Sequence, residues 1–300
     1  MGRKAVSYFY ITVAAVLWGV TGFFTKTLTG YGFTPSEMNL VRNMIAALII
    51  GAVFFITDRG IFKIRSIKDF LGIASIAVFG YCTYGAAYVV AINETSVGVA
   101  GALFYTYPAF VLVLSRFMFG EKITPKKVAV IVITTIGCLF VSGALETKGA
   151  SYSASGIFFG VVSGFTFALY NVLGKKYLSG YSAKTVTFYL FFVAIFVFSA
   201  AANPVDTISK VTASGAWLSM AGFAIAISIL PYLLHLKGLE HVEASKASII
   251  STTEPISAML LGCFAYNESP TPLKIAGIAL IVGSVCLMSS KIGEGAERQK

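Results

Sequence analysis

The chain has 300 residues, of which 57% are hydrophobic, 14% aromatic and 12% charged, and its formal net charge is +10. A soluble domain contains about 45–50% apolar and about 25% charged residues, so too few charged residues are present to cover a globule of this length. The composition excludes a soluble enzyme, a disordered protein, collagen and a secreted disulfide scaffold, and it predicts a polytopic membrane protein.

Ten apolar stretches are long enough to cross a membrane, because a helix spans about 30 Å of hydrocarbon in about 20 residues. In chain order they are 7–28, 38–57, 70–92, 96–115, 128–145, 150–174, 185–205, 211–236, 247–267 and 275–290. Seven of them contain no Asp, Glu, Lys or Arg, and the others contain one each: Lys26, Arg42 and Glu254. A β-barrel would instead show alternating strands of about ten residues. We therefore predict an all-α membrane protein with ten transmembrane helices and no second, soluble domain.

The distribution of basic residues predicts the orientation in the membrane. If the N-terminus is cytoplasmic, eighteen of the 23 basic residues fall in cytoplasmic loops or termini. Only Lys26, Lys148, Lys210 and Lys274 fall on the other side, and Arg42 lies within a span. The positive-inside rule then predicts a multi-pass protein of the plasma membrane with both termini in the cytoplasm. Since the charge orients the chain, we expect no nucleic-acid partner.

An internal repeat divides the chain. The motif E-x-x-T-P-x-K at 121–127 recurs 147 residues later at 268–274, and Pro108 and Pro255 are separated by the same offset. We expect two halves of five helices, 7–145 and 153–290, followed by a cytoplasmic tail at 291–300. Because five is odd, the second half must enter the membrane from the opposite face. Two inverted repeats of this kind are typical of secondary transporters.

Several short motifs accompany this repeat. They are Leu17-Trp18-Gly19, Arg42-Asn43, Pro108 and Gly120-Glu121 in the first half, and Thr253-Glu254-Pro255, Glu268, Gly277 and Gly283 in the second. In these motifs the sequence resembles the ten-helix EamA-domain members of the drug/metabolite transporter superfamily. The resemblance implies two EamA repeats in the inner membrane, a central cavity open alternately to each side, and export of amino acids, amines or related metabolites. Asn267 departs from the pattern, because the family usually has Gly before Glu268.

Glu254 is the only carboxylate in the interior of a predicted span, and Pro255 follows it. An acidic side chain inside the membrane is costly and is by default a functional hypothesis. Desolvation favours the protonated form of a carboxyl group, so Glu254 is a candidate proton carrier. The equivalent residue of the first half is Tyr107, which is uncharged near neutral pH. The alternative is a packing role that is independent of the substrate.

Arg42 is the basic residue of the second span, and Asn39 and Asn43 flank it. It is a candidate partner for Glu254 or for a substrate carboxylate, which a guanidinium can bind with two hydrogen bonds. The alternative is an Arg side chain that extends to the outer headgroups.

Aromatic residues of the third span form a second candidate group. Tyr81, Tyr84 and Tyr88 have the spacing of one helix face, and with Trp18 and Tyr105 they predict an aromatic wall for a ring or an amine. The alternative is ordinary packing or an interfacial belt, to which we assign Tyr88. His235 is expected at a solvated helix end, and Lys26 as an anchor at the outer end of its helix.

Further polar residues on the predicted inner helices complete the proposed translocation path. They are Thr21, Tyr170, Asn171 and Ser251. Such side chains hydrogen-bond a ligand or join one helix to another, and both readings stay open here.

Motifs for other chemistry are missing from the sequence. It contains no G-x-x-x-x-G-K-[ST] run for a nucleotide and no H-E-x-x-H pair, and Cys82, Cys138, Cys263 and Cys286 lack metal-ligand spacing. We expect no catalytic residue, metal, cofactor or nucleotide. The expected partners are a small-molecule substrate and the lipid bilayer, with protons as a candidate coupling ion. The prediction is a secondary-active exporter, and the alternatives are an uptake carrier, a membrane-embedded enzyme and a scaffold or sensor without transport.

Overall fold

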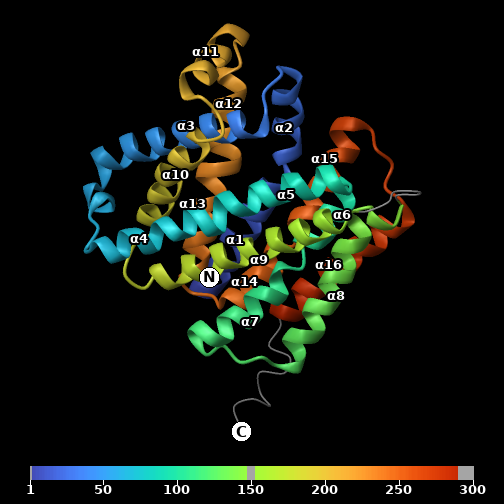
Figure 1. Ribbon diagram of the computed structural model, residues 1–300. Coiled ribbons are helices and arrows are strands. Elements are labelled where there is room, and N and C mark those ends of the chain that lie inside the picture. Colours follow the sequence, from blue (N-terminus) through green and yellow to red (C-terminus); the bar gives the residue numbers. More distant parts are fainter. Residues whose placement is uncertain (1, 147–152, 290–300) are drawn as a thin grey trace.

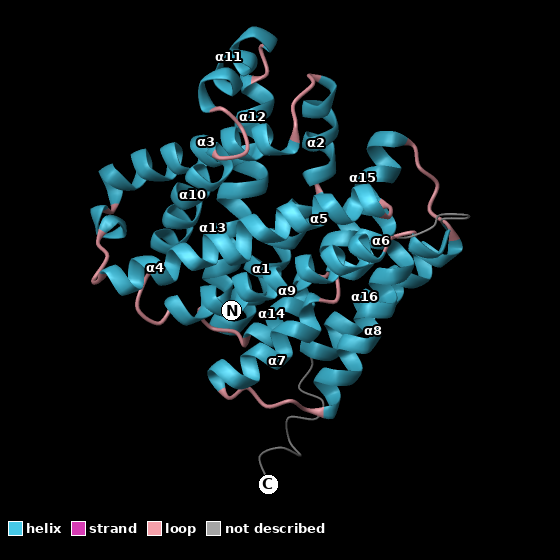
Figure 2. Cartoon of the chain, viewed as in Figure 1, coloured by secondary structure: helices cyan, strands magenta, loops and turns pink. Residues whose placement is uncertain are grey.

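The structure, a computed structural model, describes residues 2–146 and 153–289, and Figure 2 shows that helices make up almost all of this part. The helices are α1 (Arg3–Gly19), α2 (Thr21–Gly30), α3 (Pro35–Thr57), α4 (Ile67–Ser75), α5 (Thr83–Glu94), α6 (Val97–Phe104), α7 (Tyr107–Phe119), α8 (Pro125–Val141), α9 (Ala154–Tyr177), α10 (Ala183–Ser199), α11 (Pro204–Ser214), α12 (Trp217–Phe223), α13 (Leu230–Leu239), α14 (Ala244–Ser251), α15 (Glu254–Tyr266) and α16 (Pro272–Ser289). Over the described residues there is no strand, so the predicted all-α class is confirmed. The predicted tail at 291–300 lies outside this range.

The ten predicted spans all have helical counterparts. Eight helical stretches of the described chain are long and apolar enough to cross a membrane, and the pair α10–α11, bent by 99°, gives a ninth. The remaining one is α8, whose 17 residues extend about 26 Å at 1.5 Å per residue. That length is close to the hydrocarbon thickness of about 30 Å.

The seventh and eighth spans differ from the expectation. The apolar run 185–205 does not continue as one helix, because α10 ends at Ser199 and a new helix, α11, starts at Pro204. The side chain of Asn203 accepts hydrogen bonds from the backbone N–H groups of Val205 and Asp206, which caps α11. Gly215, with a φ of 68°, ends it. The eighth span therefore begins at Trp217 and not at 211.

The two halves repeat the same irregularities. The fourth span breaks between α6 and α7, directly before Pro108, and the ninth breaks between α14 and α15, directly before Pro255. A π-helical segment at Ile76–Cys82 joins α4 to α5, and another at Ala224–Ile229 joins α12 to α13. Pro108 and Pro255 have no backbone N–H donor, which accounts for the breaks in the fourth and ninth spans.

The halves have opposite directions. In Figure 1, α8 starts at the lower end of the molecule and α16 runs beside it in the opposite direction. The loop between α7 and α8 defines what we call the α7–α8 end, and the loop between α15 and α16 defines the α15–α16 end. The predicted inverted five-helix repeats are confirmed.

Two glycines allow the halves to approach each other closely at the broken helices. A Cβ atom on Gly19 of α1 would lie 2.7 Å from the carbonyl oxygen of Glu254, at the start of α15. A Cβ atom on Gly164 of α9 would lie 2.9 Å from the carbonyl oxygen of Phe104, at the end of α6. Each half thus packs its first helix against the broken helix of the other, which places both breaks near the centre of the bundle.

Candidate functional site

A cluster of aromatic side chains from both halves fills the centre of the bundle. The aromatic core, as we name it, consists of Trp18, Tyr81, Tyr84, Phe104, Tyr107, Phe167, Tyr170, Phe191 and Tyr232, linked by ring contacts. Four of the predicted site residues, Trp18, Tyr81, Tyr84 and Tyr170, are therefore brought together. Tyr105 joins them through its contact with Phe104, at 5.2 Å between ring centroids.

One contact of this core joins equivalent residues of the two halves. The hydroxyl oxygens of Tyr84 and Tyr232 lie 3.3 Å apart, and 148 residues separate the two tyrosines. The same offset relates the starts of the two π-helical segments, Ile76 and Ala224. A contact between equivalent positions lies on the internal pseudo-twofold axis, so the aromatic core is at the axis of the inverted repeat.

Arg42 contacts the aromatic core from α3. It is only 8% exposed, and its Nη2 donates a hydrogen bond of 2.8 Å to the hydroxyl of Tyr81. That hydroxyl donates in turn to Oδ1 of Asn43, at 3.1 Å, while the guanidinium carbon lies 4.9 Å from the ring centroid of Phe223. This burial contradicts the reading in which Arg42 extends to the headgroups. The Nε atom is buried and has no hydrogen-bond partner.

The predicted partnership of Arg42 with Glu254 is not formed. No ion pair or hydrogen bond joins the two side chains in the part of the chain that the structure describes. Asn39 does not extend toward the core either, because its Nδ2 donates to the carbonyl oxygen of Pro35 on its own helix.

Glu254 is the first residue of α15 and is half-buried. It interacts electrostatically with Tyr84, Tyr88, Tyr105 and Tyr107, all from the first half. Among the described residues, its carboxylate has no hydrogen bond or ion pair. The partial positive charge of a helix N-terminus stabilises a carboxylate at this position. Glu254 is therefore an acidic group near tyrosines of the other half, with no bonded partner in the part of the chain that the structure describes.

The smaller polar residues of the predicted path bind mainly to their own helices. Thr21 donates to the carbonyl oxygen of Trp18, Asn171 to that of Phe167 and Ser251 to that of Ala247. The hydroxyl of Tyr107 donates instead to the carbonyl oxygen of Ser248, at 3.0 Å. Oδ1 of Asn171 is buried without a partner, so of these residues Asn171 retains a free hydrogen-bonding atom.

The expectation that His235 lies at a solvated helix end was wrong. His235 is 0% exposed and not solvated, because α13 continues to Leu239 and α1 packs against it. Its ring lies between Trp18 and Tyr170, and its Nδ1 is 3.4 Å from the hydroxyl of Tyr170. Tyr88, which we assigned to an interfacial belt, is half-buried and packs against Phe104 with 5.5 Å between ring centroids, so its assignment stays a prediction.

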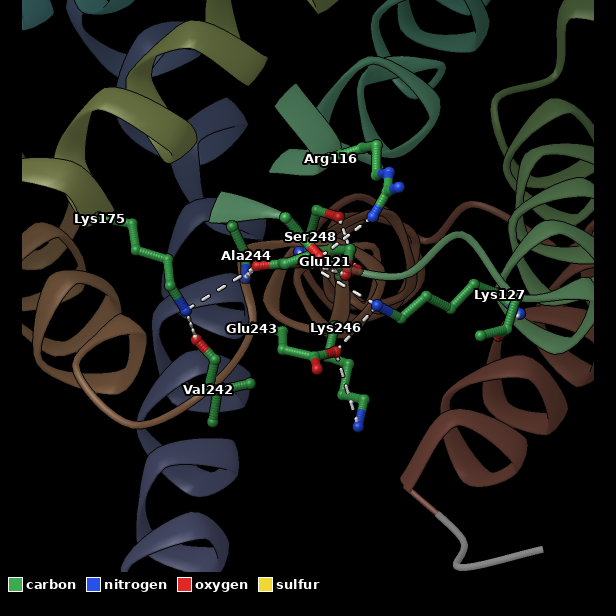
Figure 3. A network of polar contacts seen from close by, with 12 residues as sticks. Arg116, Glu121, Lys127, Lys175, Val242, Glu243, Ala244, Lys246 and Ser248 are labelled. Carbon is green, nitrogen blue, oxygen red and sulfur yellow. Dashed lines mark hydrogen bonds and ion pairs between the residues drawn. The ribbon is translucent and has the colours of Figure 1, made fainter. Parts of the chain in front are cut away.

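A second polar cluster lies at the α7–α8 end, and Figure 3 shows it. Glu121 is 8% exposed and accepts hydrogen bonds from the backbone N–H groups of Ala244 (2.8 Å) and Ser245 (3.3 Å) and from the hydroxyl of Ser245. The Nζ atoms of Lys127 and Lys175 lie 3.9 Å and 4.0 Å from its carboxylate. In the sequence, Glu121 stood out through the repeat of its motif and through the Gly120-Glu121 motif of the family resemblance. Its contacts join the two halves, which no local pattern reveals.

Lys127 also binds Glu243, with 2.9 Å between Nζ and Oε2. Burial favours the protonated form of Glu243, but the hydrogen bond and the charge of Lys127 outweigh it and lower the pKa of Glu243 from its ordinary 4.5. A hollow of about 520 Å³ adjoins this cluster and a second of about 410 Å³ lies between Asp58 and Thr185. Neither is lined by Glu254 or the aromatic core.

Comparisons with known proteins agree on one family. The sequence profile of the EamA-like transporter family matches twice, over residues 5–143 and 154–290. A relative from Archaeoglobus fulgidus, named an uncharacterized transporter, is 30% identical over 277 residues, which are 92% of this chain and 94% of that protein. The uncharacterized inner membrane transporter YicL of Salmonella typhimurium is 25% identical and covers 96% of this chain and 97% of its own length.

A solved structure has the same fold. It is titled "Crystal structure of protein", and it matches with a TM-score of 0.75 at 17% identity, over 95% of this chain and 96% of that one. At this identity the likeness supports the fold alone.

Proposed function

We propose, since the chain belongs to the EamA-like transporter family, that it is a secondary-active carrier that exports a small metabolite such as an amino acid or an amine by alternating access. The observation that carries the proposal is an aromatic core on the axis of two inverted halves, with Arg42 and Glu254 beside it. Inverted halves allow one central site to be exposed to either side of the membrane in turn.

The chemistry of the site favours a ligand with an ammonium group. Tyrosine and tryptophan faces attract cations, so the aromatic core can hold an ammonium group, while the carboxyl group of Glu254, near Tyr84, Tyr105 and Tyr107, is available to bind and release a proton. Arg42 supplies the complementary positive charge for a carboxylate. In this structure its Nη2 already donates a hydrogen bond to the hydroxyl of Tyr81. We propose that Trp18, Tyr81 and Tyr84 line the path and that Glu254 couples transport to protons.

The membrane orientation belongs to the same proposal. The halves extend over 7–145 and 153–290, both termini are cytoplasmic, and the protein resides in the plasma membrane. Uptake is the alternative direction. A membrane-embedded enzyme is the alternative class, and the relatives named as transporters favour the carrier over it.

The test begins with a thermal-shift screen of the purified protein against a library of amino acids, amines and other metabolites, because a ligand that binds the native state stabilises it. The ligand found is then offered in labelled form to liposomes that contain the protein and no ATP. We expect movement of the ligand along an imposed gradient. Turnover of a lipid without solute flux would overturn the proposal in favour of the enzyme, and neither binding nor flux would favour a scaffold.

A further inference from the structure

Glu121 closes the α7–α8 end by capping a helix of the other half. Residue 243, the position before α14, provides no side-chain cap for that helix. Glu121 takes that place from the loop between α7 and α8, with bonds to the first two backbone N–H groups of α14 (Figure 3). A carboxylate at a helix N-terminus makes charge-assisted hydrogen bonds and interacts favourably with the helix dipole.

The second half contains an equivalent glutamate and the first half an equivalent helix, but this glutamate does not cap that helix. Glu268 is equivalent to Glu121, and Val97, the first residue of α6, is equivalent to Ala244, each at an offset of 147. Glu268 is exposed, and its carboxylate is folded back toward Gly262 of α15. Within the described ranges it makes no hydrogen bond or ion pair, and α6 is capped by its own Ser96.

Helix packing shows the same asymmetry. α7 packs against both α9 and α14, and its buried residues are Tyr107, Pro108, Val111, Leu112 and Ser115. The equivalent helix α15 has at most marginal contact with α6, and it buries only Pro255 and Gly262. The halves are therefore joined at this position of the α7–α8 end, while the equivalent helices of the α15–α16 end are not joined.

We propose that Glu121 and Glu268 are two latch residues of transport that engage alternately: Glu121 caps α14 when the α7–α8 end is closed, and Glu268 caps α6 when the α15–α16 end is closed. The inference rests on the proposed alternating access and names the residues that bias it. In this structure the first latch is engaged and the second is released. A protein in which one latch is weakened shifts toward the state that the other latch holds.

Cysteine labelling tests the two latches without a substrate. In a background in which the four native cysteines are replaced, one reporter is Ala247→Cys, which the packing of α14 covers, and the other is Thr253→Cys, at the break before Glu254. Membrane-impermeant maleimide is applied from each side in vesicles of known orientation. We expect Glu121→Gln to raise the labelling rate of Ala247→Cys from the α7–α8 side about fivefold or more, and to lower that of Thr253→Cys from the other side.

Glu268→Gln provides the decisive arm of the experiment. Alone it leaves Ala247→Cys protected, because the latch that it weakens is already released. Added to Glu121→Gln, it removes the competing latch and returns both labelling rates toward those of the parent. Ser245→Ala, which removes a single bond to Glu121, gives a smaller shift in the direction of Glu121→Gln. The matched control is Glu240→Gln, which removes an exposed ion pair with Lys237 and changes neither rate.

Folding of each variant is checked by size-exclusion chromatography, and labelling is scored on the folded fraction. The latch proposal would be overturned if folded Glu121→Gln left the labelling rates unchanged. It would also be overturned if the double variant had the same labelling rates as Glu121→Gln alone. The failure of the proposed function has a different signature: the labelling shifts occur, but the parent protein moves no solute. Flux without any shift would overturn the latches and leave the carrier intact.

Discussion

Glu254 combines a half-buried position, a helix N-terminus and four tyrosine neighbours from the other half, and its carboxylate has no bonded partner among the described residues. If it carries the coupling proton, Glu254→Gln retains its shape and removes its titration. We expect this variant to fold and bind ligand as the parent does, and to lose the pH dependence of transport. The measurement is flux into liposomes as a function of pH, at equal protein content. A parent-like pH profile in Glu254→Gln would return the residue to a structural role.

The hydroxyl of Tyr81 joins two buried polar side chains, and the hydroxyl of Tyr84 does not. Its hydroxyl accepts the bond from buried Arg42 and donates to Asn43, whereas that of Tyr84 makes one 3.3 Å contact with Tyr232. Leaving buried polar groups without a partner costs about 1–3 kcal/mol. We expect Tyr81→Phe to lower the free energy of unfolding by about that amount, and Tyr84→Phe, the matched control, by clearly less. Thermal unfolding in one detergent compares them, and equal losses would show that Arg42 does not depend on Tyr81.

The sequence predicts those site residues that share a helix face or an intramembrane charge. Tyr81 and Tyr84 follow from spacing, and Glu254 and Arg42 follow from the cost of charge in a span. Tyr232 and the role of Glu121 do not follow, because their significance comes from contacts between halves. His235 was misplaced because the end of an apolar run says little about where the helix ends or which helix packs on it.

At the scale of the elements, α1 and α15 approach closely at Gly19. A Cβ atom there would lie 2.7 Å from the carbonyl oxygen of Glu254 and 2.8 Å from the backbone nitrogen of Ala258, and neither backbone atom yields easily. We expect Gly19→Ala to destabilise the protein by about 1–3 kcal/mol through overpacking. Gly22→Ala is the control, because nothing lies within 4 Å of its added Cβ. Similar melting temperatures for the two variants would contradict the close packing.

Helix existence could be predicted from the sequence, but helix bounds could not. All ten apolar runs correspond to helices, since lipid leaves the backbone no other partner. The bounds depend on caps such as Asn203 and on glycines such as Gly215, which interrupt an apolar run without changing its hydropathy. The helix α11 was missed for that reason.

For the whole molecule, the inverted repeat predicts that the two copies of the E-x-x-T-P-x-K motif face opposite sides of the membrane. Cysteines at Lys122 and Asn267, in a background without the native cysteines, should label from opposite sides with an impermeant reagent. The positive-inside rule places Lys122 in the cytoplasm. Labelling of both sites from the same side would contradict the inversion, and labelling from opposite sides but with Lys122 outside would reverse only the proposed orientation.

The central claim is that one site on the axis of two inverted halves opens to each side in turn. Counterflow measures this directly: liposomes containing the protein are loaded with unlabelled ligand from the thermal-shift screen and diluted into a trace of labelled ligand, with no ATP and no ion gradient. We predict a transient accumulation of labelled ligand inside, because the site carries unlabelled ligand out and returns with labelled ligand. Ligand that binds the protein but shows no accumulation, with chemical conversion of ligand or lipid in the same vesicles, would contradict the account.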